Sequence, residues 1–192
     1  MEEFSTFVTH LECSETGKHY PADQLHGLSD AGKPLLVRYD LDGLGKAVTK
    51  QDLKARLPEL WRYREFLPVR HSQNVVRLGE LMTPLLPATK IQREYQCGEI
   101  LIKDEGRLPT GSFKARGLTM AVSMAKELGV SVMAMPTNGN AGAALAAYCS
   151  RADIETYVFC PEDTPAVNVE EIAFQGLKHF WLTALSTIVV AS

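Results

Sequence analysis

A lysine stands at the start of a predicted helix, in the run TGSFK, where backbone N–H groups carry partial positive charge. This residue, Lys114, has the apolar neighbours Phe113 and Leu118, which favour its burial. Burial and the positive helix end both favour the neutral amine, which can attack an aldehyde. The residues therefore indicate a carrier for a carbonyl cofactor, and a solvated surface lysine is the alternative interpretation.

A second turn, PTNGNAG, spans residues 136–142 and stands between a predicted strand and a predicted helix. Its glycines let backbone N–H groups approach an anion, and Asn138 and Asn140 add side-chain donors. An ordinary strand-to-helix turn with an asparagine cap is the alternative. Consecutive strand–helix units place such turns at the same edge of a parallel sheet, so we expect this turn to face Lys114.

The chain after residue 98 alternates between strand and helix patterns, which is typical of an α/β fold. We expect strands at 99–103, 130–136 and 154–161 with a fourth from 178, and helices at 112–129, 140–152 and 164–176. Thr164 is expected to cap the last helix and Gly176 to end it. Right-handed crossovers then predict a parallel sheet with helices on both faces.

The first part of the chain predicts a small β-rich segment, because residues 4–40 form short apolar runs broken by turn residues. Within it, LECSETGKHY is similar to half of a zinc ribbon, but the expected second half has no cysteine. Cys13, His19 and His26 do not make a four-ligand zinc site. We therefore expect this unit to hold no metal.

Composition argues against several classes of function. The formal net charge of −3 provides no basic surface for nucleic acid, and no apolar run approaches the roughly 20 residues that cross a bilayer. The N-terminus lacks a signal-peptide layout, and the four cysteines are widely spaced, as expected of reduced thiols in the cytoplasm. We therefore expect a cytoplasmic protein that acts on a small molecule and binds neither nucleic acid nor membrane.

Two runs together, LPTGSFKARG and PTNGNAGAALAAY, resemble the fold-type II pyridoxal-phosphate enzymes, and most closely the threonine synthases. LGELMTPLLPA upstream and CPEDTPAVNVEEIAFQG downstream resemble the same family, so the resemblance covers about residues 8–177. Ala115, where many relatives carry aspartate, and Leu81, where glycine is usual, depart from the pattern. The resemblance implies a partial catalytic domain over residues 76–192, preceded by a ribbon-like and helical segment over residues 1–75.

The resemblance also implies roles for individual residues. Lys114 would hold pyridoxal 5′-phosphate through its amine and then move protons, so it is both the cofactor-binding and the catalytic residue. Phe113 would lie at the cofactor, and Asn140 would hydrogen-bond the 3′-oxygen of the cofactor ring. The residues expected to meet the substrate are Ser112, where phosphate leaves, and Thr137, Asn138 and Gly139, near the substrate carboxylate.

The implied reaction converts O-phosphohomoserine and water to threonine and phosphate. A threonine or serine dehydratase-like enzyme of the same fold and a non-catalytic fragment remain as alternatives. No glycine-rich stretch follows Gly142 to cradle the cofactor phosphate, and the chain ends in the apolar run LKHFWLTALSTIVVAS. We therefore expect a truncated form that lacks the C-terminal phosphate-binding part, with a homo-oligomer or a missing C-terminal portion as its partner.

Overall fold

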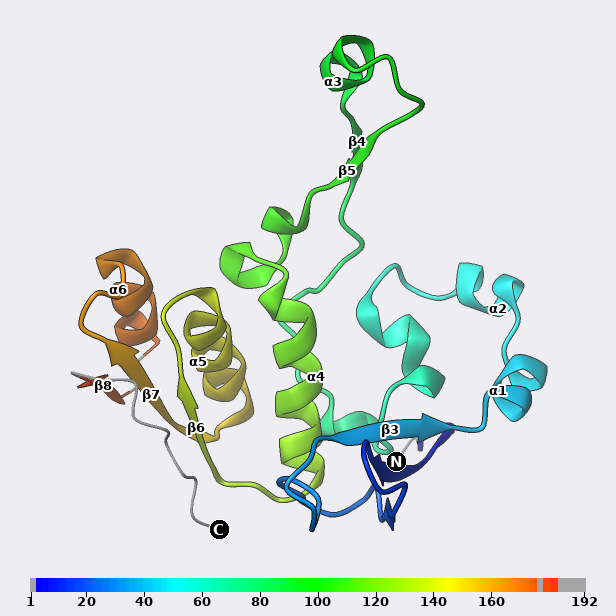
Figure 1. Ribbon diagram of the computed structural model, residues 1–192, viewed down its shortest axis with the longest axis vertical. Helices are drawn as coiled ribbons and strands as arrows, with labels where there is room; N and C mark the ends of the chain where they lie inside the picture. Colours follow the sequence, from blue (N-terminus) through cyan, green and yellow to red (C-terminus); the bar gives the residue numbers. More distant parts are fainter. Residues whose placement is uncertain (1–2, 176–177, 183–192) are drawn as a thin grey trace.

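A computed structural model describes residues 3–175 and 178–182 (Figure 1). The described elements form three groups along the chain, and each group has its own small sheet. None of the described helices is both long enough and apolar enough to cross a membrane.

The N-terminal segment is built on an antiparallel sheet, as expected. In this sheet β1 (Val8–Cys13) lies between β2 (His19–Tyr20) and β3 (Leu35–Tyr39). Short helical elements follow: α1 (Leu41–Ala47), α2 (Lys50–Ala55) and 3-10 turns at Leu60–Phe66 and Ser72–Asn74. Thr49 starts α2 through a capping box with Asp52, in which each side chain binds the other residue's backbone N–H.

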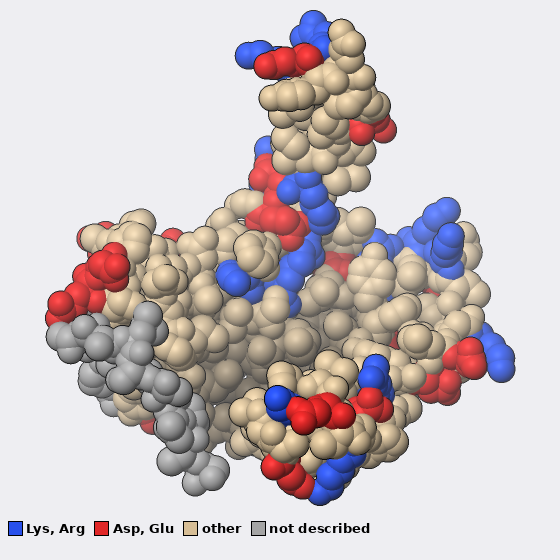
Figure 2. All heavy atoms as spheres, viewed as in Figure 1, with Lys and Arg blue, Asp and Glu red and all other residues tan. Residues whose placement is uncertain are grey.

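A projecting hairpin comes next, and it corrects one expectation. β5 (Leu101–Lys103) pairs antiparallel with β4 (Leu85–Pro87), with α3 (Thr89–Glu94) at the tip, and not with the parallel sheet. The connector before α3 supplies the backbone partners of β5, and 3-10 turns at Glu105–Arg107 and Pro109–Gly111 then lead the chain away from it. Figure 1 shows this hairpin standing clear of the other two groups, and Figure 2 shows it largely uncharged between tip and base.

The third group holds the candidate site and follows the predicted alternation of strand and helix. Its elements are α4 (Lys114–Glu127), β6 (Val132–Pro136), α5 (Asn140–Ala152), β7 (Glu155–Pro161), α6 (Ala166–Phe174) and β8 (Lys178–Leu182). The strands pair in parallel in the order β6-β7-β8. Pro165 occupies the N-cap position of α6, so the expectation of a Thr164 cap is wrong. Gly176 and the expected continuation of β8 beyond residue 182 lie outside the described residues.

The helices of this group cover one face of the sheet, so the expectation of helices on both faces is not met in the described part of the chain. Val158 and Cys160 of β7 pack against Ala143 of α5 and Ile172 of α6 in one buried cluster. On the other face, Val132, Ala134 and Pro136 of β6 are exposed. The cause is the strand order: right-handed crossovers between consecutive neighbouring strands place every helix on the same side.

The pair α4 and α5 forms the centre of the main core. Leu118 and Val122 of α4 pack against Leu145 and Tyr148 of α5, and all four side chains are buried. Ala144 lies in the same cluster and, being small, lets the two helices approach closely. The first turns of α4 and α5 are thereby held at the same end of the molecule, as Figure 1 shows.

Candidate functional site

Lys114 is the first residue of α4, and the loop before it is tightly wound. Thr110 and Gly111 have φ angles of 63° and 64°, so two successive residues adopt the left-handed conformation that side chains disfavour. Ser112 then returns to extended backbone, and α4 begins without a side-chain cap. The local strain is confined to the turn that delivers the lysine.

The amine of Lys114 contacts one side chain, that of its neighbour. Its Nζ lies 4.7 Å from the centre of the Phe113 ring, as in a cation–π contact. The described residues offer this amine no hydrogen bond and no ion pair. The expected burial by Phe113 is wrong, because Phe113 is 60% exposed, and Lys114 itself is half-buried. The arrangement leaves the amine available to react.

Two hydroxyl groups beside the lysine are buried without a partner. Neither Thr110 Oγ1 nor Ser112 Oγ has a hydrogen-bond partner among the described residues. Buried polar atoms nearly always have a hydrogen-bond partner in folded proteins. Two buried hydroxyl groups without a partner in one turn therefore indicate room for a polar ligand. Ser112 was expected from the sequence; Thr110 was not, although it stands in the same PTGSFK run.

The second turn is organised by Thr137. Its Oγ1 donates a hydrogen bond to the Gly139 carbonyl oxygen (3.0 Å) and accepts from the N–H groups of Gly139 (3.2 Å) and Gly142 (3.1 Å). A Cβ on Gly142 would lie 2.2 Å from Thr137 Cγ2, so only glycine fits there. The hydroxyl of Thr137 is therefore used to close the turn, while Asn138 is exposed at its tip.

Asn140 begins α5, and its side chain is oriented from a neighbouring helix. Asn168 Nδ2, in the first turn of α6, donates to Asn140 Oδ1 over 3.1 Å. Because this bond uses the amide oxygen of Asn140, its Nδ2 is left to donate to a ligand. Asn168 was not foreseen, since a single asparagine in the run AVNVEE carries no sequence signal of this contact.

A charged pair anchors the start of α4. Arg116 donates from Nε to Glu105 Oε2 (2.6 Å) and from NH2 to Glu105 Oε1 (2.9 Å), and Thr83 Oγ1 also donates to that carboxylate (2.5 Å). The bond from Arg116 lowers the pKa of Glu105 to about 2. Two residues before Arg116 stands Lys114, so this network fixes the turn that carries the lysine.

An apolar cavity of about 500 Å³ lies next to this region but does not include the lysine. It is lined by Leu78, Thr110, Ala143, Ala147, Val167, Glu170, Glu171, Phe174 and Gln175. Thr110 is the residue that the cavity shares with the lysine turn. The residues predicted for the site do not line this cavity, and it meets the lysine turn only at Thr110.

Comparison with known proteins identifies the family of this chain. The sequence pattern of the "Pyridoxal-phosphate dependent enzyme" family matches residues 76–185, more than half of the chain. Threonine synthase of Methanocaldococcus jannaschii is 36% identical over 167 residues, which are 86% of this chain and 41% of that protein. Threonine synthase of Methanosarcina acetivorans is 33% identical over 88% of this chain and 41% of that protein. The chain thus spans about 41% of the length of these relatives.

Among solved structures, a holo diaminopropionate ammonia lyase from Escherichia coli superposes with a TM-score of 0.52 and 18% identity. The match covers 58% of this chain and 34% of the lyase, and it shows a shared fold alone. The family pattern and the two curated relatives carry the assignment. This chain belongs to the pyridoxal-phosphate dependent enzyme family, and the two curated relatives described above are threonine synthases.

Proposed function

We propose that this chain contributes the lysine half of a threonine synthase-type active site, which converts O-phosphohomoserine and water to threonine and phosphate. The observation that carries the proposal is the Lys114 amine, which has no hydrogen bond or ion pair within the described residues and stands beside two buried, unpartnered hydroxyls. The printed names of the relatives support the substrate class. Because the chain spans about 41% of their length, the activity of the whole enzyme belongs to the proposal as well.

The residues present fit pyridoxal phosphate. Lys114 would hold the cofactor, Phe113 lies beside its amine, and the free Nδ2 of Asn140 would donate to the ring oxygen. Ser112 and Thr110 would supply hydroxyl groups to a polar ligand at the start of α4. When bound, pyridoxal phosphate supplies an electron sink that stabilises negative charge at the substrate α-carbon.

The protein groups would perform binding and proton transfer around that cofactor. The amine of Lys114 would also act as a base that takes a proton from the substrate α-carbon and returns it later. Asn138 and Gly139, at the tip of the second turn, would meet the substrate carboxylate. Thr137 supports them by holding the turn closed through its three hydrogen bonds.

The direct test is to trap the cofactor on the lysine. The purified chain is mixed with pyridoxal phosphate, reduced with borohydride and digested, and the modified peptide is identified by mass. We expect one label per chain on Lys114, and none there in Lys114→Ala. Lys126→Ala is the matched control, because Lys126 is an exposed lysine in the last turn of the same helix.

Label spread over surface lysines would overturn the proposal and favour a non-catalytic fragment. If Lys114 is labelled, a panel of O-phosphohomoserine, threonine and serine distinguishes the threonine synthase-type reaction from a dehydratase-like one. Turnover of threonine or serine to a keto acid, without turnover of O-phosphohomoserine, would replace the proposed substrate.

A further inference from the structure

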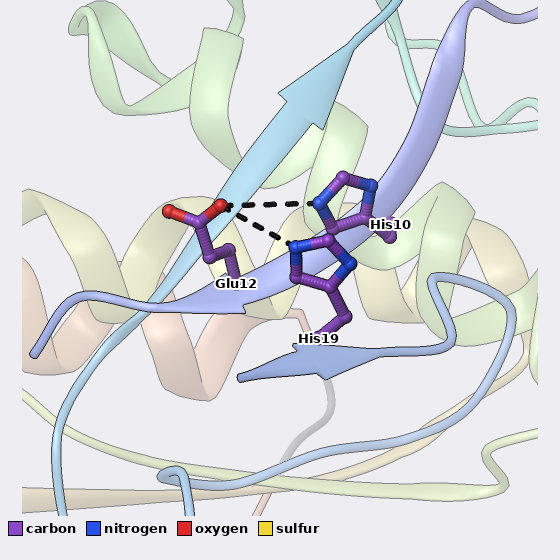
Figure 3. Close-up of side chains that lie close together, drawn as sticks. All are labelled: His10, Glu12 and His19. Carbon is purple, nitrogen blue, oxygen red and sulfur yellow. Dashed lines mark ion pairs between the residues drawn. The ribbon is translucent and has the colours of Figure 1, made fainter. Parts of the chain in front are cut away.

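Three side chains with metal-binding atoms meet on one face of the N-terminal sheet, far from the lysine in sequence. His10 and Glu12 are two residues apart on β1, so they point to the same side of the strand. His19 of β2 is the residue directly opposite Glu12 in the antiparallel register. The pairing of the strands, which the sequence alone does not reveal, is what assembles this cluster (Figure 3).

The ligand atoms of the cluster converge. Glu12 Oε2 lies 4.0 Å from His10 Nε2 and 3.7 Å from His19 Nε2, and one ligand atom from each residue lies within 4.8 Å of the others. The two imidazole rings lie almost stacked, with centres 3.9 Å apart and planes inclined by 30°. Figure 3 shows both rings turned toward the same carboxylate oxygen.

Neighbouring groups hold these ligands in the orientation that a metal requires. Arg38 NH2 donates to Glu12 Oε1 over 2.5 Å, which leaves Oε2 toward the two histidines. Thr9 Oγ1 lies 2.9 Å from His10 Nδ1, so Nε2 is the ring nitrogen left for a ligand. His10 Nε2 is buried and has no hydrogen-bond partner among the described residues. Hydrogen bonds to the atoms that do not bind the metal fix the tautomer and the orientation of metal-binding side chains.

We propose that His10 Nε2, Glu12 Oε2 and His19 Nε2 bind one divalent transition-metal ion, with Zn²⁺ as the best match. Two imidazoles and one carboxylate are ligands that suit Zn²⁺ and its neighbours in the first row, whereas Mg²⁺ and Ca²⁺ require mostly oxygen. Tetrahedral Zn²⁺ with bonds of about 2.0–2.2 Å needs ligand atoms roughly 3.4 Å apart. His19, whose side chain is 64% exposed, can close the remaining gap by turning its ring. Water fills the remaining position.

The sequence predicted that this unit holds no metal, because Cys13, His19 and His26 do not make a four-ligand zinc site, and the proposed set departs from that expectation. Cys13 faces away from the cluster and is buried, and its thiol donates to Ser29 Oγ over 3.1 Å. His26 Nε2 is 2.8 Å from the Pro21 carbonyl oxygen, outside the cluster. The ion would join β1 to β2 across the turn at residues 14–18, so its effect would be to stabilise the pairing of the two-residue strand β2 with β1.

The test measures Zn²⁺ binding to the full chain by titration calorimetry, with His19→Ala and with the control His26→Ala. We expect one equivalent of Zn²⁺, an affinity that falls at least about tenfold in His19→Ala, and no change in His26→Ala. His19 is exposed, so its substitution leaves the fold intact, and circular dichroism verifies this. Equal affinity in His19→Ala and the unsubstituted chain, or no binding by either, would overturn the proposal.

Co²⁺ provides a second readout that separates this site from the cysteines. Bound by nitrogen and oxygen, Co²⁺ gives weak visible bands; bound by a thiolate, it adds an intense sulfur-to-metal charge-transfer band. We expect the Co²⁺ spectrum of the chain to lack the charge-transfer band. We expect the same spectrum in Cys13→Ser and in Cys97→Ser. A charge-transfer band that disappears in either variant would assign the metal to the thiol and overturn the proposed ligand set.

Discussion

The side chain of Asn140 is held by a hydrogen bond from Asn168, whose Nδ2 lies 3.1 Å from Asn140 Oδ1. The bond connects the first residue of α5 to the first turn of α6, two helices that also pack against each other. It uses the amide oxygen of Asn140 and leaves the Nδ2 donor of that amide free to bind another group. Asn168, for which the sequence predicted no role, thus orients the side chain of Asn140.

We expect Asn168→Ala to weaken pyridoxal phosphate binding about fivefold, because a neutral hydrogen bond is worth about 1 kcal/mol. The dissociation constant is measured by absorbance titration, with the melting temperature recorded in parallel. Gln51→Ala is the control, since Gln51 carries an exposed amide on α2 and does not line the cavity beside the candidate site. Equal affinities in the two variants would show that Asn168 does not position Asn140.

The pair formed by Glu105 and Arg116 predicts a pH dependence of stability. The arginine lowers the pKa of Glu105 from an ordinary 4.5 to about 2. A depressed pKa means that the folded state favours the carboxylate, so the stabilisation is complete above about pH 5 and is lost as the pH falls from 4.5 toward 2. Glu105→Gln should lower the free energy of unfolding by about 1–2 kcal/mol at pH 7 and by roughly half of that or less at pH 3.

Urea denaturation at the two pH values measures this difference. Asp104→Asn is the matched control, because the pair of Asp104 with Arg107 is more exposed and should contribute under about 0.5 kcal/mol. A loss in Glu105→Gln that is the same at both pH values would contradict the assigned pKa.

Gly142 and Gly117 predict opposite outcomes for the same substitution. A Cβ on Gly142 would lie 2.2 Å from Thr137 Cγ2 and 3.0 Å from Val158 Cγ1, and Thr137 is held by its own hydrogen bonds. Gly142→Ala should therefore destabilise the chain by about 1–3 kcal/mol. Gly117, the fourth residue of α4, has open space around it, so Gly117→Ala should stabilise the chain by about 0.4–1 kcal/mol. Thermal denaturation measures the stability of both variants. A lower stability of Gly117→Ala as well as of Gly142→Ala would mean that α4 needs its glycine for another reason.

Tyr148 and Glu80 form a buried pair that joins α5 to the connector before β4. The Tyr148 hydroxyl donates to Glu80 Oε1, and burial, together with the adjacent carboxylate, raises the pKa of Tyr148. Tyr148→Phe leaves a buried carboxylate short of a donor, so we expect a loss of about 1–3 kcal/mol in the free energy of unfolding. Tyr95→Phe, at an exposed tyrosine, should change it by less than about 0.5 kcal/mol. Chemical denaturation measures both, and equal small effects would show that the pair is not coupled.

The helices and strands around the site were predictable from local patterns. The small-residue run of α5 and the glycine after α4, Gly129 with a φ of 72°, place these elements within a few residues. The partner of β5 was not predictable, because pairing between strands is decided by tertiary contacts. The same limit hid the contact of Asn168 with Asn140 and the grouping of His10 with His19, which depend on helix packing and on strand register. The division of the chain at residue 75 stays a prediction.

The projecting hairpin and the candidate lysine share one anchor. The second strand of the hairpin is followed by Asp104 and Glu105, and Arg116 in the first turn of α4 donates to the Glu105 carboxylate. Thr83, just before the first strand of the hairpin, donates to the same carboxylate. Glu105 is thus the point at which the hairpin is attached to α4. One carboxylate therefore holds both the base of the hairpin and the first turn of α4, so a change in the position of the hairpin base would also bear on the turn that carries Lys114.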